Sequence, residues 1–244
     1  MKLITFKASF LISLFVIIGS YSCFAQDPFP KPLVGDESGF VSIFDGKTLT
    51  DWEGDSLYWH VENGAIVGEV TPETILKRNT FLIWRGGTAN DFELKLEYKV
   101  SDQGNSGINY RSFEVAGVPF ALKGYQFDID GQGEWTGQNY EERGREFLAL
   151  RGQIAKVDNQ QKVFEVGKVG DKSALLSFIK KDDWNECHII VRGNTLIHII
   201  NNQIMSVVID DDTLNRKKDG LLGMQVHVGP PMKIEYRNIR LKKF

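Results

Sequence analysis

Hydrophobic and polar residues alternate along most of the chain from Gly39 onward. In the segment Phe92–Val100, apolar and charged residues alternate without exception. A period of two is typical of a β-strand with one buried and one solvated face. Apolar segments of similar length predict further strands at 40–44, 57–62, 65–70, 80–84, 106–111, 122–130, 146–150, 161–166, 186–192, 195–200, 203–209, 221–228 and 233–242.

Short turn sequences separate the predicted strands. Asn63-Gly64, Gly193-Asn194 and Asn201-Asn202 contain residues that tolerate the positive φ of tight hairpins. The run 186–209 is therefore predicted to be a three-stranded meander, and only Lys172–Lys180 has the pattern of a short helix. Many strands, close turns and little helix predict an all-β fold, a two-sheet antiparallel β-sandwich or jelly roll.

The first 25 residues have the organisation of a secretory signal. Lys2 and Lys7 precede an apolar run at 10–18, and Cys23-Phe24-Ala25 resembles a cleavage site. The run is shorter than a membrane span, so we expect no transmembrane segment. We expect an exported protein, periplasmic or secreted, and the alternative to cleavage after Ala25 is a lipid anchor on Cys23. Residues 26–38 read as a Pro-rich extended arm or linker, and 39–244 as one domain.

Composition narrows the function classes. The formal net charge is −3, from 29 basic and 32 acidic residues, and no basic block stands out. A nucleic-acid partner is therefore not expected. Cys187 is the one cysteine outside the predicted leader, so the domain has no internal disulfide, and its apolar strand predicts a buried structural thiol.

Strand parity places unusual polar residues on shared faces. Because successive side chains alternate across a strand, apolar residues such as Tyr125 and Phe127 oppose a polar set. These amides, carboxylates, Arg and His suit hydrogen bonding to sugar hydroxyls, whereas the alternative is an ordinary solvated sheet. The polar set consists of Asn105, Asn109, Arg111, Gln126, Asp128, Asp130, Gln225 and His227.

The Gly-rich segment 131–145 follows one of these strands and concentrates aromatic and ionisable residues. Trp135 and Tyr140 offer flat faces for a pyranose, and Glu142 and its charged neighbours offer hydrogen bonds to hydroxyls. We therefore expect this segment to bind carbohydrate, and the alternative is a structural loop that holds an Arg–Glu cluster.

Several known chemistries lack their signatures. The sequence has no nucleophile elbow, zinc-protease helix, phosphate-binding loop or dinucleotide fingerprint. It also lacks the alternating Glu-x-Asp-x-Glu strand that jelly-roll glucanases use as a carboxylate pair. Asp210-Asp211-Asp212 is predicted to be a solvated turn rather than a calcium site.

In combination, these segments resemble the 3-keto-disaccharide hydrolase domain family. The resemblance runs from about Gly39 to Lys243, and Gln126 stands where many members carry Glu. The matching segments are Phe44-Asp45-Gly46-Lys47-Thr48-Leu49-x-x-Trp52, Trp59-x-Val61-Glu62-Asn63-Gly64-Ala65-Ile66-Val67-Gly68, Asp91-Phe92-Glu93-Leu94, Gly104-Asn105-Ser106-Gly107-Ile108-x-Tyr110-Arg111, Trp184-Asn185 and Arg237-Asn238-Ile239.

The resemblance implies an exported, concanavalin-like β-sandwich that cleaves glycosides already oxidised to a ketone at C3. The ketone acidifies the hydrogen on C2, so a base, a donor to the enolate oxygen and an acid for the leaving group would drive β-elimination, followed by hydration.

On this basis we assign candidate roles to residues of the polar set and of the segment 131–145. His227 or Asp128 is the expected base, and Arg111 with Asn105 is expected to stabilise the enolate. Glu142 or Tyr140 is the expected acid, and Gln126, Trp135 and Gln225 are expected to hold the sugar. A divalent metal on Asp128, Glu142 or His227 stays open. The alternative function is a non-catalytic carbohydrate-binding module, although the ionisable residues favour an enzyme.

Overall fold

A computed structural model describes residues 37–244 of the protein. The predicted leader, Cys23 and nearly all of the arm lie outside these residues and stay predictions. Within the described part of the chain, no helix is long and apolar enough to cross a membrane.

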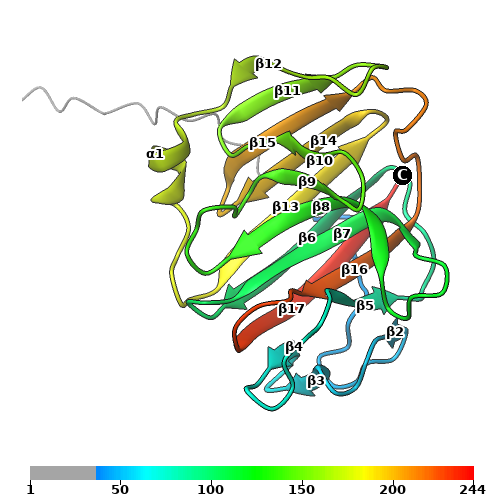
Figure 1. Ribbon diagram of the computed structural model, residues 1–244, viewed down its shortest axis with the longest axis vertical. Helices are drawn as coiled ribbons and strands as arrows, with labels where there is room; N and C mark the ends of the chain where they lie inside the picture. The colour runs from blue at the N-terminus through cyan, green and yellow to red at the C-terminus, as the bar shows by residue number, and fades with distance from the viewer. Residues whose placement is uncertain (1–36) are drawn as a thin grey trace, which may run out of the picture.

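In residues 37–244, two β-sheets are stacked face to face, with a single short helix, α1 (Lys172–Leu176), at one side (Figure 1). The larger sheet has ten strands in the order β12 (Val163–Lys168), β11 (Gln153–Val157), β15 (Gln203–Asp210), β14 (Thr195–Ile200), β13 (Asn185–Arg192), β6 (Phe92–Val100), β17 (Met232–Lys243), β4 (Ala65–Val70) and β3 (Trp59–Glu62), with β1 (Val41–Ser42) on β17.

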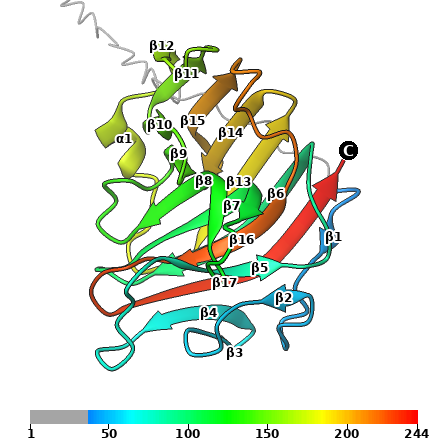
Figure 2. The same cartoon turned by 45° about the vertical axis from the view of Figure 1, so that its right-hand side comes forward.

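The smaller sheet lies in front of the larger one in Figure 1 and curves over it in the turned view of Figure 2. It has seven strands in the order β10 (Glu146–Ala149), β9 (Asn139–Glu142), β8 (Leu122–Asp130), β7 (Asn105–Glu114), β16 (Leu221–Val226), β5 (Thr80–Trp84) and β2 (Trp52–Glu53).

The core lies between the sheets and follows the alternation in the sequence. Tyr125 and Phe127 of β8 and Ile189 of β13 are fully buried, and Leu96 of β6 is almost so. Each buried side chain of this size contributes roughly 1.5–3 kcal/mol of transfer free energy. Cys187 is buried beside them as a free thiol, as predicted.

The predicted fold class is confirmed, and so is the meander, which is formed by β13, β14 and β15. The sequence pattern missed β2, β9 and β11, which have two, four and five residues. One pairing departs from the antiparallel prediction, because β11 runs parallel to β15. The predicted helix is present but ends at Leu176.

The prediction of a solvated turn at Asp210–Asp212 is wrong at its two ends. Asp210 and Asp212 are fully buried and form ion pairs with Arg145 at 2.6 Å and 3.2 Å. Arg145 also pairs with the buried Glu141. This cluster joins β9 to the end of β15. Each buried charge has a partner of opposite sign, and this attraction offsets the cost of removing the charges from water.

Candidate active site

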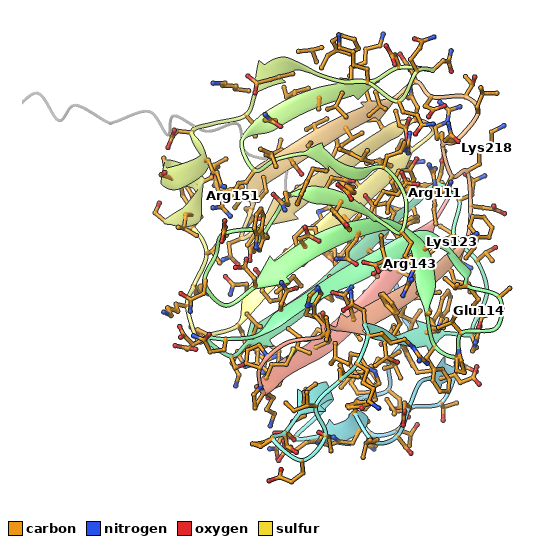
Figure 3. All side chains as sticks on the ribbon, viewed as in Figure 1. Arg111, Glu114, Lys123, Arg143, Arg151 and Lys218 are labelled. Atoms are coloured by element: carbon orange, nitrogen blue, oxygen red, sulfur yellow. The ribbon has the colours of Figure 1, made fainter. Side chains whose placement is uncertain are left out.

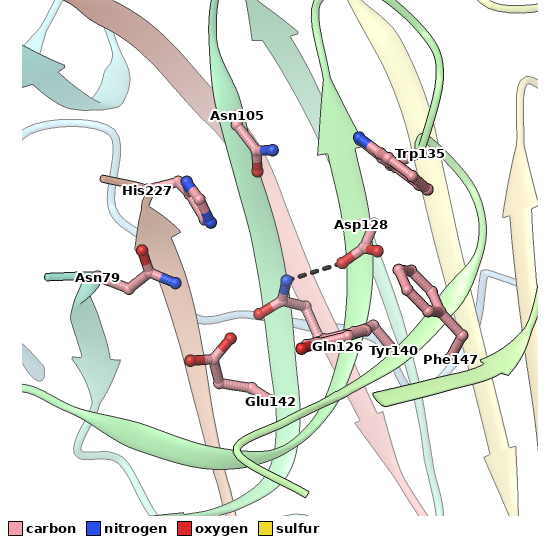
Figure 4. Close-up of a pocket in the computed structure, with 9 residues that line it drawn as sticks. All are labelled: Asn79, Asn105, Gln126, Asp128, Trp135, Tyr140, Glu142, Phe147 and His227. Carbon is pink, nitrogen blue, oxygen red and sulfur yellow. Dashed lines mark hydrogen bonds between the residues drawn. The ribbon is translucent and has the colours of Figure 1, made fainter. Parts of the chain in front are cut away.

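An open pocket of about 280 Å³ lies on the outer face of the smaller sheet (Figure 4). Strand alternation explains its position, since Tyr125 and Phe127 point into the core while their neighbours on β8 point outward. The pocket is lined by Asn79, Asn105, Gln126, Asp128, Trp135, Tyr140, Glu142, Phe147 and His227.

Gly107 allows the floor of the pocket to form. It pairs with Asp128 across β7 and β8. A Cβ at Gly107 would lie 2.6 Å from Cγ and Cδ of Gln126, closer than real contacts allow. The missing side chain therefore lets Gln126 lie across the strand and reach Asp128.

Asp128 is held between two amides at the floor. Nε2 of Gln126 donates to Oδ1 at 2.7 Å, and Nε2 of Gln138 donates to Oδ2 at 2.9 Å. Burial raises the pKa of Asp128 to about 7, and the nearby charges of Asp130 and Glu142 add to the rise, although both amides oppose it. Asp128 therefore exchanges a proton near neutral pH.

Glu142 is joined to this floor through Gln225. Nε2 of Gln225 donates to Oε1 of Gln126 at 3.1 Å and to Oε2 of Glu142 at 3.4 Å. Burial raises the pKa of Glu142, and the charge of Arg143 and the amides of Asn79 and Gln225 oppose the rise. The second carboxyl is thus held beside the first by amides.

His227 faces the pocket from the end of β16 (Figure 4). Its Nδ1 lies 2.6 Å from the carbonyl oxygen of Val228. A carbonyl oxygen only accepts, so Nδ1 carries the hydrogen and the Nε2 lone pair is left free in the neutral ring. Burial lowers the pKa of His227, which favours that neutral form.

The structure brings together most of the predicted site residues. His227, Asp128, Glu142, Asn105, Gln126, Trp135 and Tyr140 all line the pocket. Gln225 is fully buried and supports the floor through the two hydrogen bonds described above.

The prediction that Arg111 shares this face is wrong. The pairing of β7 with β8 shifts register between Tyr110 and Phe113, and Arg111 has a φ of 45°. This irregularity breaks the alternation, so the side chain turns away from the pocket. Arg111 is fully buried in another part of the molecule (Figure 3).

The guanidinium of Arg111 has a full set of partners there. Its Nη1 donates to the carbonyl oxygens of Gly193 and Lys217 at 2.8 Å and 3.1 Å, and Nε donates to that of Asn90 at 2.8 Å. Nη2 pairs with Asp91 at 3.0 Å. Arg111 therefore joins three loops and has no donor left for a substrate.

Sequence reasoning missed Asn79 and Phe147. Asn79 directly precedes the apolar strand β5, and no motif marks it. Phe147 lies in a predicted strand beside the apolar Leu148 and Ala149, so no local pattern marks it as a pocket residue. Its 42% exposure shows that it faces outward. The position of β10 at the edge of the smaller sheet, which the sequence does not reveal, places Phe147 beside the pocket.

A metal site is not formed by the described residues. Within 37–244, no group of three or more His, Cys, Asp or Glu side chains is arranged to hold a metal ion. Asp128, Glu142 and His227 line one pocket, but amides occupy the space between the carboxyls.

A polar pocket beside aromatic rings on one sheet of a β-sandwich is typical of proteins that bind carbohydrate. Over residues 39–242 the sequence matches the 3-keto-alpha-glucoside-1,2-lyase-like domain, and the chain belongs to this family. A 3-keto-disaccharide hydrolase of Bacteroides thetaiotaomicron is 27% identical over 185 residues, which cover 69% of this chain. The match spans 58% of that relative, somewhat more than half of its length.

Solved structures share the fold. Two crystal structures of candidate glycosyl hydrolases from Parabacteroides distasonis superpose with TM-scores of 0.57 and 0.53, at 17% and 21% identity. They cover 84% of this chain, and the match covers 99% and 94% of theirs. A carbohydrate-binding module from Bacillus subtilis superposes with a TM-score of 0.53 at 10% identity, over 79% of this chain and 96% of that chain.

Replacing Arg111 by Met tests its structural role. The change leaves three backbone carbonyls and Asp91 without their donor, so we expect the free energy of unfolding to fall by roughly 3 kcal/mol. Urea unfolding followed by tryptophan fluorescence measures this. Lys218→Met, at an exposed position, is the control and should change stability little. Equal stability of the two variants would contradict the role assigned to Arg111.

The raised pKa of Asp128 should make the free energy of unfolding depend on pH. Between the unfolded pKa of about 4 and the folded pKa of about 7, the folded state binds more protons, so stability falls as pH rises. Asp128→Asn removes this dependence. We therefore expect the variant to gain stability relative to the wild type between pH 4 and pH 8, by up to about 4 kcal/mol.

Urea unfolding at several pH values measures the difference. Asparagine has one acceptor oxygen instead of two, so the variant loses one hydrogen bond. The stability lost with it does not depend on pH and therefore cancels when values at different pH are compared. Asp219→Asn, at an exposed carboxylate, is the matched control. A stability difference between Asp128→Asn and wild type that does not change with pH would rule out the raised pKa.

Proposed function

We propose that the protein cleaves glycosides whose sugar has been oxidised to a ketone at C3, by elimination followed by hydration. One observation carries the proposal. His227, with a free Nε2, and Asp128, with a pKa near 7, line one pocket from opposite sides (Figure 4). A neutral imidazole and a protonated carboxyl at neutral pH form a base and an acid, and family membership supports this substrate class.

In the first step, Nε2 of His227 takes the proton from C2. The electron pair of the C2–H bond forms a C2–C3 double bond, and the ketone oxygen becomes an enolate oxygen. The side-chain amide of Asn105 lines the pocket and makes no hydrogen bond to another described residue, so its N–H group is free to stabilise this oxygen. Asn105 takes over the role that Arg111 was expected to share.

In the second step, the enolate restores the ketone and forms a C1–C2 double bond while the bond from C1 to the leaving oxygen breaks. Asp128 gives its proton to that oxygen. Water then adds to C1, giving a proton to the Asp128 carboxylate, and His227 returns a proton to C2. The net reaction consumes one water, and both residues recover their starting states.

The remaining polar groups orient the sugar in this scheme. Gln126 crosses the floor between the base and the acid, and Glu142 presents a buried carboxyl on the side of His227 (Figure 4). Amide and carboxyl groups of this kind bind sugar hydroxyls, and holding the ring keeps C2 close to His227.

The substrate class is tested with purified protein and two glucosides that differ only in oxidation at C3. Release of the leaving group from the 3-keto-glucoside, with none from the unoxidised parent, is expected. Binding of both without release would favour a carbohydrate-binding module. Release from the unoxidised parent alone would show an ordinary glycosidase and contradict the proposal.

Removing either proton-transfer group is expected to lower turnover more than binding. His227→Gln and Asp128→Asn should each reduce kcat at least 100-fold while KM changes little, because general acid and base groups contribute about 10²–10⁴-fold. His60→Gln, at an exposed histidine, is the control. Full activity of either variant would remove that residue from the mechanism.

The pH profile gives a separate prediction. Activity needs neutral His227, whose pKa is lowered, and protonated Asp128, whose pKa is about 7. We expect kcat/KM to fall as the pH rises above about 7, because Asp128 loses its proton. A profile that keeps rising to pH 9 would contradict the role of Asp128 as acid.

A further inference from the structure

One side of the pocket is an aromatic wall, formed by Trp135, Tyr140 and Phe147 (Figure 4). The rings of Trp135 and Phe147 are stacked, with centroids 5.6 Å apart and planes 23° apart. The ring of Tyr140 lies edge-on to that of Phe147, with the two centroids 5.1 Å apart. Phe147 is nevertheless 42% exposed. An exposed phenyl ring beside a polar pocket is typical of a ligand contact rather than of a folding core.

The wall is held in place before any ligand arrives. The buried carboxylate of Asp130 accepts the backbone N–H groups of Glu134, Trp135 and Thr136 at 2.8–2.9 Å. Arg151, buried beside α1 (Figure 3), donates to the carbonyl oxygens of Gly133 and Thr136 at 2.8 Å and 2.6 Å.

These contacts fix the Gly-rich segment that carries Trp135. Two buried charges thus keep a surface ring in one place, which lowers the entropy cost of stacking a ligand on the wall.

The wall lies on one particular side of the proposed chemistry. In Figure 4, Asp128 lies beside Trp135 and Phe147 of the aromatic wall, whereas His227, Asn79 and Glu142 lie on the opposite side of the pocket from these two rings. Asp128 gives its proton to the leaving oxygen in the proposed mechanism. A sugar with C2 near His227 therefore directs its leaving group past Asp128, toward the rings.

We infer that the aromatic wall is a binding site for the leaving group, and that it selects glycosides whose leaving group carries a six-membered ring with an apolar face. This inference rests on the proposed function and assigns the second half of the substrate. An aryl ring and a second pyranose share this chemistry, and Phe147 is the ring that offers most open surface to them.

The test compares methyl and benzyl 3-keto-glucosides, with a 3-keto-disaccharide as a third substrate. Methanol and benzyl alcohol have nearly equal acidity, so a rate difference reports on the ring rather than on the leaving ability. The wild type should cleave the benzyl substrate with a kcat/KM about tenfold above the methyl substrate. The disaccharide distinguishes a site for sugars from one for aryl groups only.

Phe147→Ala and Phe147→Leu separate the flat ring from apolar volume. Both should lower kcat/KM for the benzyl substrate about tenfold more than for the methyl substrate. The matched control is Phe164→Ala, because Phe164 is 39% exposed on β12 and does not line the pocket. Far-ultraviolet circular dichroism and thermal unfolding of each variant confirm that it is folded.

The outcomes separate this inference from the proposed function. A wild type that prefers benzyl, with that preference lost in both Phe147 variants, supports the leaving-group site. If the wild type shows no preference, or if the Phe147 variants lower kcat/KM equally for both substrates, the leaving-group site is overturned. The proposed function then still stands. A wild type that cleaves no 3-keto-glycoside overturns the proposed function itself.

Discussion

The chemistry proposed for this protein depends on the burial of one carboxyl group. Asp128 is 8% exposed on the outer face of a sheet, and its oxygens accept one hydrogen bond each from Gln126 and Gln138. Two neutral amides replace only part of the water that the charged form would have, so the proton is held to about pH 7. An unburied aspartate would be ionised at that pH and would be a poor acid for an alkoxide leaving group.

The rest of the pocket maintains this arrangement. Gly107 leaves room for Gln126 to cross the sheet, and Gln225 fixes Gln126 from β16, on the far side of β7. The carboxylate of Asp130 is directed away from the pocket and holds the following loop instead. Two aspartates on the same face of β8 thus differ because their hydrogen-bond partners differ. The proposed mechanism assigns proton transfer to Asp128, whereas Asp130 holds the loop.

Strand alternation made much of the fold and site predictable. The patterns around Tyr125–Ile129 and Met224–Val226 place apolar residues in the core. They place Gln126, Asp128 and Gln225 on the opposite face of the sheet, as the structure confirms. Arg111 was misplaced because a register shift and a positive φ interrupt the alternation. Such irregularities depend on neighbouring strands, which a single sequence does not reveal.

Two other features depended on long-range contacts. Asp210 looked like a residue of a solvated turn until the structure placed Arg145 against it. Phe147 lies in a predicted strand whose exposed side the sequence does not mark, and its strand is the edge of the smaller sheet. Both features depend on how segments that are distant in the sequence assemble, so local pattern carries no information about them.

The central claim is that cleavage begins with removal of the C2 proton. Its most direct test is cleavage of a 3-keto-glucoside in D₂O, stopped after few turnovers and corrected for exchange without enzyme. Because His227 exchanges its proton with solvent before returning one to C2, the account predicts one deuterium on C2 of the sugar product, found by mass spectrometry. Release of the leaving group with the original C2 proton retained would contradict it.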